Sequence, residues 1–372
     1  MSKVQLVAVA LIFFLVGTGV GFVLGPIFLK PVNPYDVAIV FATGGLGDKS
    51  FNDGVFEGAA LAAADFNTTF TWVEPTEVAE FEPFLRHYAM HPEWLTPYKL
   101  IIGVGFTQVT AMQNVAGQFP AQKFAIVDEY INETIYPNVA SLLFDEEEAG
   151  ALAGAIAGMY TQTGILGYIG GMSGIPLLWK FAAGFFWGAN ITRPELGITV
   201  AAGGDNVSVA YVADTPAGFT DIAGAQLLAD GMYGSNVDII FAAAGRSGLG
   251  VFASAKDNND TLGPIWVVGV DSPQMYLGTA DPDNPAPPTL CLTTALKNVQ
   301  VAAYNIIRDA TQEGATWTPG INKFNLTNGG HDYEENPALL QLSTAAKAAV
   351  EQLKQDIINN VLDPPTSYEW VK

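Results

Sequence analysis

The chain has 372 residues, of which 49% are apolar and only 14% are charged, so it is no disordered polypeptide and is long enough for two domains. Its formal net charge of −21 argues against a nucleic-acid partner, because phosphate backbones are bound by basic patches. The single cysteine, Cys291, excludes an intramolecular disulfide and a cysteine-based metal cluster, and three histidines leave little material for a metal enzyme.

The first predicted element is a membrane anchor within residues 1–30. No charged residue occurs from residue 4 to residue 29, and Lys3 and Lys30 bound this stretch. It exceeds both the roughly 20 residues that cross a bilayer core and the roughly 7–15 apolar residues of a cleaved signal peptide. We therefore expect an uncleaved, single-pass N-terminal transmembrane helix.

Six Asn-x-Ser/Thr sequons favour a soluble domain outside the cell membrane and predict a glycoprotein. They begin at Asn67, Asn132, Asn190, Asn206, Asn259 and Asn325. The alternative is a cytosolic domain on a membrane tether.

The rest of the chain alternates between short runs rich in Val, Ile and Phe and longer helical periods. Continuous apolar runs are typical of strands in a parallel sheet that is covered on both faces. The predicted strands are 37–41, 100–104, 124–127, 140–144, 165–169, 207–212, 238–242, 265–270 and 290–294. Apolar stripes at helical spacing lie within 51–66, 149–159, 299–310 and 346–357. This alternation predicts an α/β fold with two doubly wound lobes.

One predicted helix carries Gly150, Gly154 and Gly158, four residues apart. Its apolar run is too short to span a membrane, so this spacing predicts close packing of the helix on a sheet.

Residues just past the predicted strands are the candidates for a ligand site, because ligands of open α/β sheets bind beyond the carboxyl ends of the strands. Asp128 follows one strand and Asp271 follows another, while Lys297 lies after 290–294 at an expected helix start. Glycine-rich turns follow two further strands, at 44–47 and 245–250. We expect these groups to converge on one cleft.

Seven stretches of the sequence are similar to those of a known family. They are GGLGDKSFNDGVFEGA (44–59), FAIVDE (124–129), LFDEEEAGALAGAIA (143–157), GYIGGMSGIPLLWKFAAGFFWGA (167–189), AAAGRSGLGVFASAK (242–256), VVGVDSPQ (267–274) and LTTALKNVQVAAYNII (292–307). With these stretches the chain resembles the basic membrane protein family of substrate-binding proteins, whose best-understood members are purine-nucleoside receptors of ABC importers. The resemblance covers nearly all of residues 36–360.

This resemblance implies a type I periplasmic-binding-protein fold, in which two Rossmann-like lobes hold a ligand between them. A hinge of three crossing strands is then expected, with crossings near residues 144, 272 and 320. The implied domains are a transmembrane anchor (1–30), lobe 1 (36–144 plus 273–320), lobe 2 (145–272 plus 321–360) and a tail (361–372).

The resemblance also implies a role for several side chains. Asp128 and Asp271 would accept hydrogen bonds from ribose hydroxyls, and Lys297 would donate to the sugar and neutralise carboxylate charge. Phe51 would stack on a base, with Phe219 as the second ring. Each has a plainer alternative: a loop turn or helix cap for the aspartates, a solvated helix start for the lysine, and core packing for the rings.

Three further residues complete the expected ligand site. Asn52 suits the edge of a base because its amide both donates and accepts, although it equally suits a helix cap. Gly245 would let backbone approach the ligand. Arg246 stands where the family commonly has glycine, and could add donors to the ligand, pair with an aspartate or point to solvent. Asp48 is expected to order its turn, and Ala42 replaces an aspartate that many family members use to read the base.

The sequence thus predicts a membrane-anchored extracytoplasmic substrate-binding protein that captures a nucleoside and delivers it to an ABC permease. We expect no enzymatic activity, no cofactor, no metal and no nucleic acid. The alternatives are a ligand sensor or surface protein on the same fold without transport, and an enzyme that hydrolyses a nucleoside. A modified nucleoside, a nucleobase or another small polar metabolite also stays open as the ligand.

Overall fold

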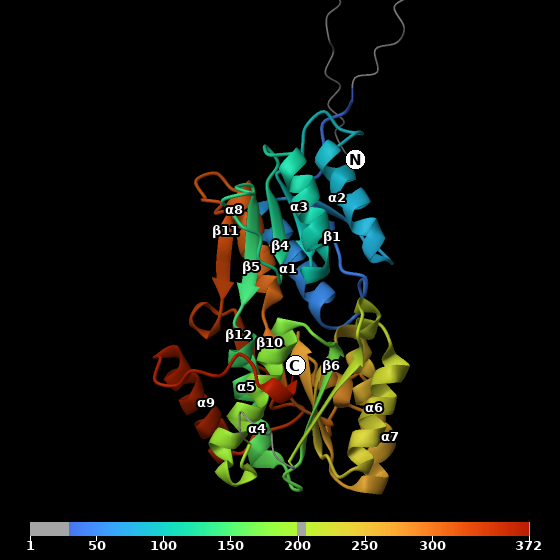
Figure 1. Cartoon of the computed structure of the whole chain (residues 1–372), viewed down its shortest axis with the longest axis vertical. Coiled ribbons are helices and arrows are strands. Elements are labelled where there is room, and N and C mark those ends of the chain that lie inside the picture. The colour runs from blue at the N-terminus through green and yellow to red at the C-terminus, as the bar shows by residue number, and fades with distance from the viewer. Residues whose placement is uncertain (1–29, 199–205, 372) are drawn as a thin grey trace, which may run out of the picture.

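The computed structural model describes residues 30–198 and 206–371, and it contains two lobes that are each built on a six-stranded sheet (Figure 1). Every strand predicted from the sequence is present within a few residues of its expected position, so the α/β fold is confirmed. The expected transmembrane helix falls on residues that lie outside this description. Within the described ranges, no helix combines the length and apolar character that crossing a membrane requires.

Lobe 1 is a parallel sheet covered by helices on both faces. In order across the sheet its strands are β11 (Gly320–Phe324), β5 (Val139–Phe144), β4 (Phe124–Val127), β3 (Leu100–Val104), β1 (Val37–Val40) and β2 (Phe70–Val73). Helices α1 (Phe51–Phe66) and α8 (Val299–Thr311) pack on one face, and α2 (Phe81–Met90) and α3 (Val109–Gln118) on the other. The central strands are fully buried, which explains their continuous apolar sequences.

Lobe 2 repeats this arrangement. Its strands are, in order, β12 (His331–Tyr333), β10 (Cys291–Lys297), β9 (Trp266–Asp271), β8 (Ile239–Ala243), β6 (Leu166–Met172) and β7 (Val207–Ala213). Only β12 runs antiparallel to its neighbour. Helices α4 (Glu146–Tyr160), α5 (Pro176–Thr192) and α9 (Thr344–Ile358) cover one face, and α6 (Ile222–Gly234) and α7 (Gly248–Leu262) the other.

The glycines of α4 have a different neighbour from the expected one. A Cβ atom at Gly150, Gly154 or Gly158 would overlap the backbone of α5 at Phe181, Phe185 or Ala189, respectively. The spacing therefore serves the close approach of two helices, and the predicted packing of these glycines on the sheet is wrong. This contact holds the N-termini of α4 and α5 together beside the inter-lobe boundary (Figure 1).

The chain passes between the two lobes three times. It crosses from β5 to α4, from β10 to α8, and from β11 to β12. The first crossing lies near residue 144, as expected. The second follows Lys297 rather than residue 272, because β10 pairs with β9 in the second sheet, and the third follows Phe324 rather than residue 320.

Two further expectations differ from the structure. Lys297 is the last residue of a strand and does not begin a helix. The expected tail beyond residue 360 is held by lobe 2, since Tyr368 and Val371 are buried and the Trp370 ring packs on Phe186 of α5. The C-terminal segment therefore forms part of the second lobe's core.

Candidate ligand-binding site

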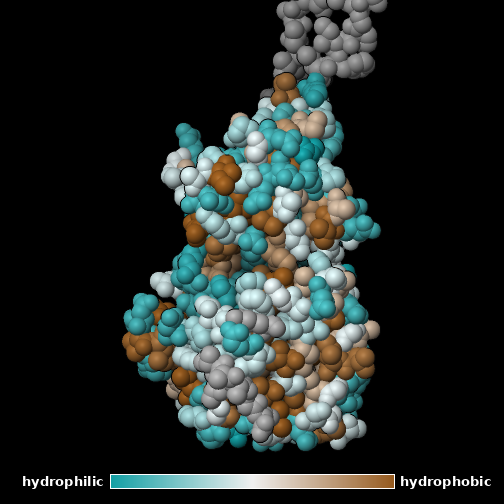
Figure 2. All heavy atoms as spheres, viewed as in Figure 1, coloured by the Kyte–Doolittle hydropathy of each residue, from teal (hydrophilic) through white to brown (hydrophobic). Residues whose placement is uncertain are grey.

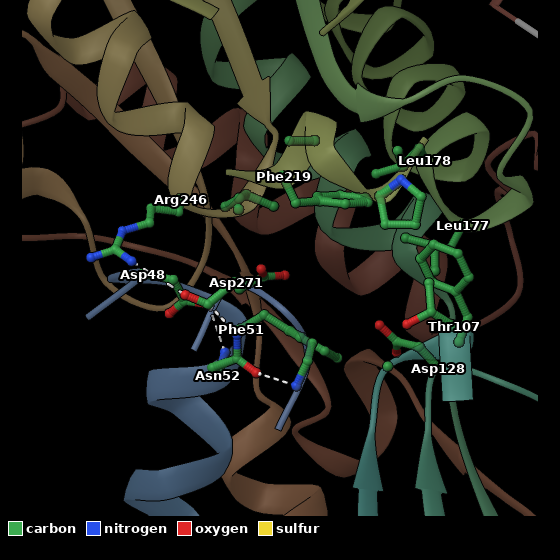
Figure 3. Close-up of a pocket in the computed structure, with 18 of the residues that line it drawn as sticks. Asp48, Phe51, Asn52, Thr107, Asp128, Leu177, Leu178, Phe219, Arg246 and Asp271 are labelled. Carbon is green, nitrogen blue, oxygen red and sulfur yellow. Dashed lines mark hydrogen bonds between the residues drawn. The ribbon is translucent and has the colours of Figure 1, made fainter. Parts of the chain in front are cut away.

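The candidate site is a cavity between the two lobes that is partly open to solvent. In the space-filling view the molecule narrows where the lobes meet (Figure 2). The cavity brings together all eight residues that the sequence singled out: Phe51, Asn52, Asp128, Phe219, Gly245, Arg246, Asp271 and Lys297 (Figure 3). Their roles toward a ligand remain predictions.

Lys297 is the electrostatic centre of this cavity. Its ammonium nitrogen lies 2.5 Å from Asp128 Oδ1 and 3.0 Å from Glu146 Oε1, and its side chain is only 1% exposed. The same nitrogen lies 4.7 Å from the ring centroid of Phe144 and 5.5 Å from that of Phe51. Burial alone would lower the Lys297 pKa, but Asp128 and Glu146 outweigh it and raise this pKa above its ordinary value. The lysine is therefore charged throughout the physiological range.

Both site aspartates have an uncommon backbone conformation. Asp128 follows β4 with a φ of 69°, and Asp271 ends β9 with a φ of 63°. Residues other than glycine rarely adopt this left-handed backbone conformation, although aspartate tolerates it better than most. Both residues line the cavity. Strained positions of this kind cluster at functional sites, which fits a ligand-binding role.

The two carboxyl groups are not equivalent. Asp271 Oδ2 accepts a hydrogen bond of 2.5 Å from the Ser50 hydroxyl, which precedes α1 in the opposite lobe. Burial raises the pKa of Asp271 to about 7, and it raises that of Asp128 to about 6 against the opposing charge of Lys297. In both groups burial outweighs the neighbours that stabilise the ionised form, so hydrogen-bond donors from a ligand would favour that form further.

Glu146 belongs to the site, although the sequence drew attention only to the acidic start of its helix. Its second oxygen, Oε2, lies 3.0 Å from Lys180 Nζ, so one buried carboxylate bridges two lysines. Lys180 also donates to the Phe144 carbonyl oxygen at 2.7 Å. Lys297 and Lys180 lower the pKa of Glu146 in spite of its burial. Glu146 does not line the cavity but contacts Lys297, whereas Asp128 contacts Lys297 and also lines the cavity.

Aromatic side chains form the two walls of the cavity. Phe51 of lobe 1 and Phe219 of lobe 2 face each other across it (Figure 3). Phe106, which follows β3, packs edge-on against Phe219 with 6.2 Å between the ring centroids, so the rings join the lobes. Leu177 and Phe181 of α5 extend the apolar wall. A flat ring would fit between such surfaces.

The glycine-rich turn of lobe 1 is ordered by Asp48, as expected. Its carboxylate accepts hydrogen bonds from the backbone N–H groups of Ser50, Asn52 and Asp53 and from the Asn52 side chain. Asn52 Oδ1 in turn accepts from the Ala42 N–H at 3.0 Å. Asn52 is not the helix cap of the plain alternative, because Ser50 holds the N-cap position of α1 and Asn52 is the second residue of the helix. It lines the pocket, and most of its polar capacity orders the turn.

The turn after β8 supplies Gly245 and Arg246. Gly245 has a φ of 54° and lies against the Phe219 ring, which brings the backbone to the cavity wall. Arg246 extends toward the lobe 1 glycine turn, where Nη1 lies 3.4 Å from the Gly44 carbonyl oxygen. Of the three alternatives for Arg246, neither pairing with an aspartate nor simple exposure fits this position.

Comparison with known proteins relates most of the chain to one group. The family described as "ABC transporter substrate-binding protein PnrA-like" matches residues 35–365. An uncharacterised lipoprotein of Pyrococcus horikoshii is 32% identical over 84% of this chain and 72% of its own length. The "ABC transporter nucleoside-binding protein BmpA" of Lactococcus lactis is 29% identical over 88% of each chain. A solute-binding protein of an Aeropyrum pernix ABC transporter system has a similar structure, with a TM-score of 0.73, 26% identity and coverage of 90% of this chain and 94% of that one.

Replacing Lys297 tests the ionic centre. In Lys297→Met, Asp128 and Glu146 lose their shared cation while buried, so we expect the free energy of unfolding to fall by about 3–5 kcal/mol at pH 8. Urea unfolding followed by circular dichroism measures this. The loss should shrink at pH 5, because a protonated Asp128 no longer needs the cation.

Lys347→Met is the matched control, because the Lys347–Glu335 pair lies at the surface and should contribute less than about 1 kcal/mol. An unchanged free energy of unfolding for Lys297→Met at pH 8 would contradict this account.

Proposed function

The chain belongs to the family of PnrA-like ABC transporter substrate-binding proteins, and we propose that it captures a nucleoside between its two lobes and delivers it to an ABC permease. The observation that carries the proposal is the meeting of Asp128, Asp271 and Lys297, from three separate strand ends, beside two facing aromatic rings. Vicinal hydroxyls suit carboxylates that can only accept hydrogen bonds, and a heterocyclic base suits the space between rings.

Two facts support a nucleoside over other small ligands. Asp128, Asp271 and Lys297 interact with one another in the cavity wall, and the rings Phe51 and Phe219 line the same cavity (Figure 3). This combination suits a molecule with a hydroxylated part joined to a flat apolar part. In addition, a relative that covers most of this chain is named as a nucleoside-binding protein.

We place the protein at the outer surface of a membrane. The uncharged segment 4–29 precedes the lobes, and a relative is named as a lipoprotein. The cysteine of this chain, Cys291, is buried in β10, so attachment would rest on the apolar segment rather than on a lipid-modified cysteine.

Binding of a nucleoside panel tests the ligand class. Isothermal titration of the purified full-length protein should show binding of at least one nucleoside, and Asp271→Ala should weaken it at least tenfold. One hydrogen bond to a charged group is worth about 1.5–3 kcal/mol, and about 1.4 kcal/mol is tenfold in affinity. Asp214→Ala, which removes a carboxylate outside the cavity, should leave the affinity unchanged. No heat with any nucleoside, from a folded protein, would remove the proposal.

The affinity should also depend on pH. Burial raises the pKa of Asp271 to about 7, with Lys297, Ser50, Asp128 and Asp48 as its charged or polar neighbours. A hydroxyl donor needs the ionised carboxylate, so affinity should rise with pH, mostly between about 6 and 8, and level off above. Titrations from pH 5.5 to 8.5 measure this.

In Asp271→Asn the rise between pH 6 and pH 8 should largely disappear. Glu147 and Glu148 serve as an internal check, because burial raises both pKa values to about 7 although neither side chain lines the cavity. A pH profile that is the same in Asp271→Asn and in the unmodified protein would show that another group controls binding.

Membrane attachment is tested by deleting residues 4–29. The full-length protein should remain with the membrane pellet after a carbonate wash and should be cleaved by protease added outside intact cells. The deletion variant should be soluble and retain nucleoside binding. Retention of the deletion variant in the pellet would assign attachment to another part of the chain.

A further inference from the structure

Arg246 is an ionised group in the cavity wall whose hydrogen-bonding capacity is largely unused. It is half-buried, and its one hydrogen bond in the described structure runs to the Gly44 carbonyl oxygen at a long 3.4 Å. Among the residues that the structure describes, no carboxylate pairs with it, although the chain has 37 acidic and 16 basic residues. A guanidinium group carries several N–H donors in a fixed plane, so most of them remain available to a ligand.

The polar groups of the lobe 1 turn that Arg246 approaches are already engaged. Asp48 already accepts from the backbone N–H groups of Ser50, Asn52 and Asp53 and from the Asn52 side chain. Asn52 Oδ1 is engaged as well, because the Ala42 N–H donates to it. The acceptors of this turn are therefore used within lobe 1, whereas most of the N–H donors of Arg246 are not used.

Acceptors for a hydroxylated part of a ligand lie farther from Arg246. Asp128, beside Lys297, lies at the far side of the cavity from Arg246, and Asp271 lies between Asp128 and Asp48 (Figure 3). Phe51 and Phe219 lie between Arg246 and Asp128 (Figure 3). A ligand with hydroxyl donors at one end would thus place its ring between the phenylalanines and the ring edge near Arg246.

We propose that Arg246 determines base specificity, and that it favours nucleosides of 6-oxopurines, such as guanosine and inosine, over adenosine. This rests on the proposed nucleoside-binding function. The 6-oxo group and the adjacent N7 both accept hydrogen bonds, and they match the planar fork of a guanidinium. Adenosine presents an amino donor beside N7, and this donor would face the donors of Arg246 without a partner.

An alternative role for Arg246 is to stabilise the closed arrangement of the two lobes, which we call a latch. Arg246 reaches from lobe 2 to the Gly44 carbonyl of lobe 1, so it could hold the closed lobes together without contacting the base. A latch stabilises the closed form equally for every ligand, whereas a base-reading residue changes the ratio of affinities. The ratio is therefore the deciding measurement.

Isothermal titration of the full-length protein with guanosine, 7-deazaguanosine and adenosine tests the proposal. We expect guanosine to bind about tenfold or more tightly than adenosine, because a bidentate arginine contact discriminates by roughly that factor or more. 7-Deazaguanosine, which lacks the N7 acceptor, should fall between the two. Equal affinities for guanosine and adenosine would overturn the proposal.

Two variants distinguish recognition of the base by Arg246 from stabilisation of the closed lobes. Arg246→Met keeps an unbranched apolar stem and removes the N–H donors, and it should weaken guanosine binding at least tenfold more than adenosine binding. Lys256→Met, a change of similar chemistry on α7 away from the cavity, should leave the guanosine-to-adenosine ratio as it is. An equal loss for both nucleosides in Arg246→Met would identify a latch and overturn base reading. If the unmodified protein bound no nucleoside, both this inference and the proposed function would be wrong. If it bound guanosine and adenosine equally well, only this inference would be wrong.

Discussion

The buried contact of Lys297 with Asp128 and Glu146 is the interaction on which the rest of the site depends. A lysine with 1% of its side chain exposed is stable only with partners, and two carboxylates supply them. Lys297 ends β10 just before the chain crosses to lobe 1, and Glu146 begins α4 just after the chain has crossed to lobe 2. The same charges that shape the cavity therefore lie at two of the inter-lobe crossings, so a ligand that changes their balance also acts on the relative position of the lobes.

The strand ends could be read from the sequence, because each of them is a local feature. The buried apolar runs located the central strands, and the residue after each run gave Asp128 and Asp271. The same rule applied to the end of β3 would have found Phe106 and Thr107, which also line the cavity. The edge strands β2, β11 and β12 escaped prediction, because they are short or partly exposed and so lack a continuous apolar run.

Pairings between distant residues could not be read locally. Lys297 was expected at a helix start, and its partners are Asp128 and Glu146, far away in the sequence. The four-residue spacing of glycines in α4 indicated a close approach, but nothing in it said whether the neighbour was a sheet or α5. Likewise, the second crossing between lobes depends on β10 pairing with β9, which is a property of the sheet order. Only the resemblance to a family indicated which distant residues belong to one site. It suggested the roles of these residues but not the contacts between them.

The charge around the cavity also limits the class of ligand. Asp128, Glu146 and Asp271 carry one more carboxylate than Lys297 and Lys180 can neutralise, and burial raises the pKa of Asp271 in spite of the charge of Lys297. A phosphate brought to this end would add negative charge to a buried site that already has an excess of it. A hydroxylated, uncharged sugar instead donates hydrogen bonds to the surplus acceptors without adding charge. If the ligand is a nucleoside, as proposed, this charge distribution favours it over the corresponding nucleotide through electrostatics alone.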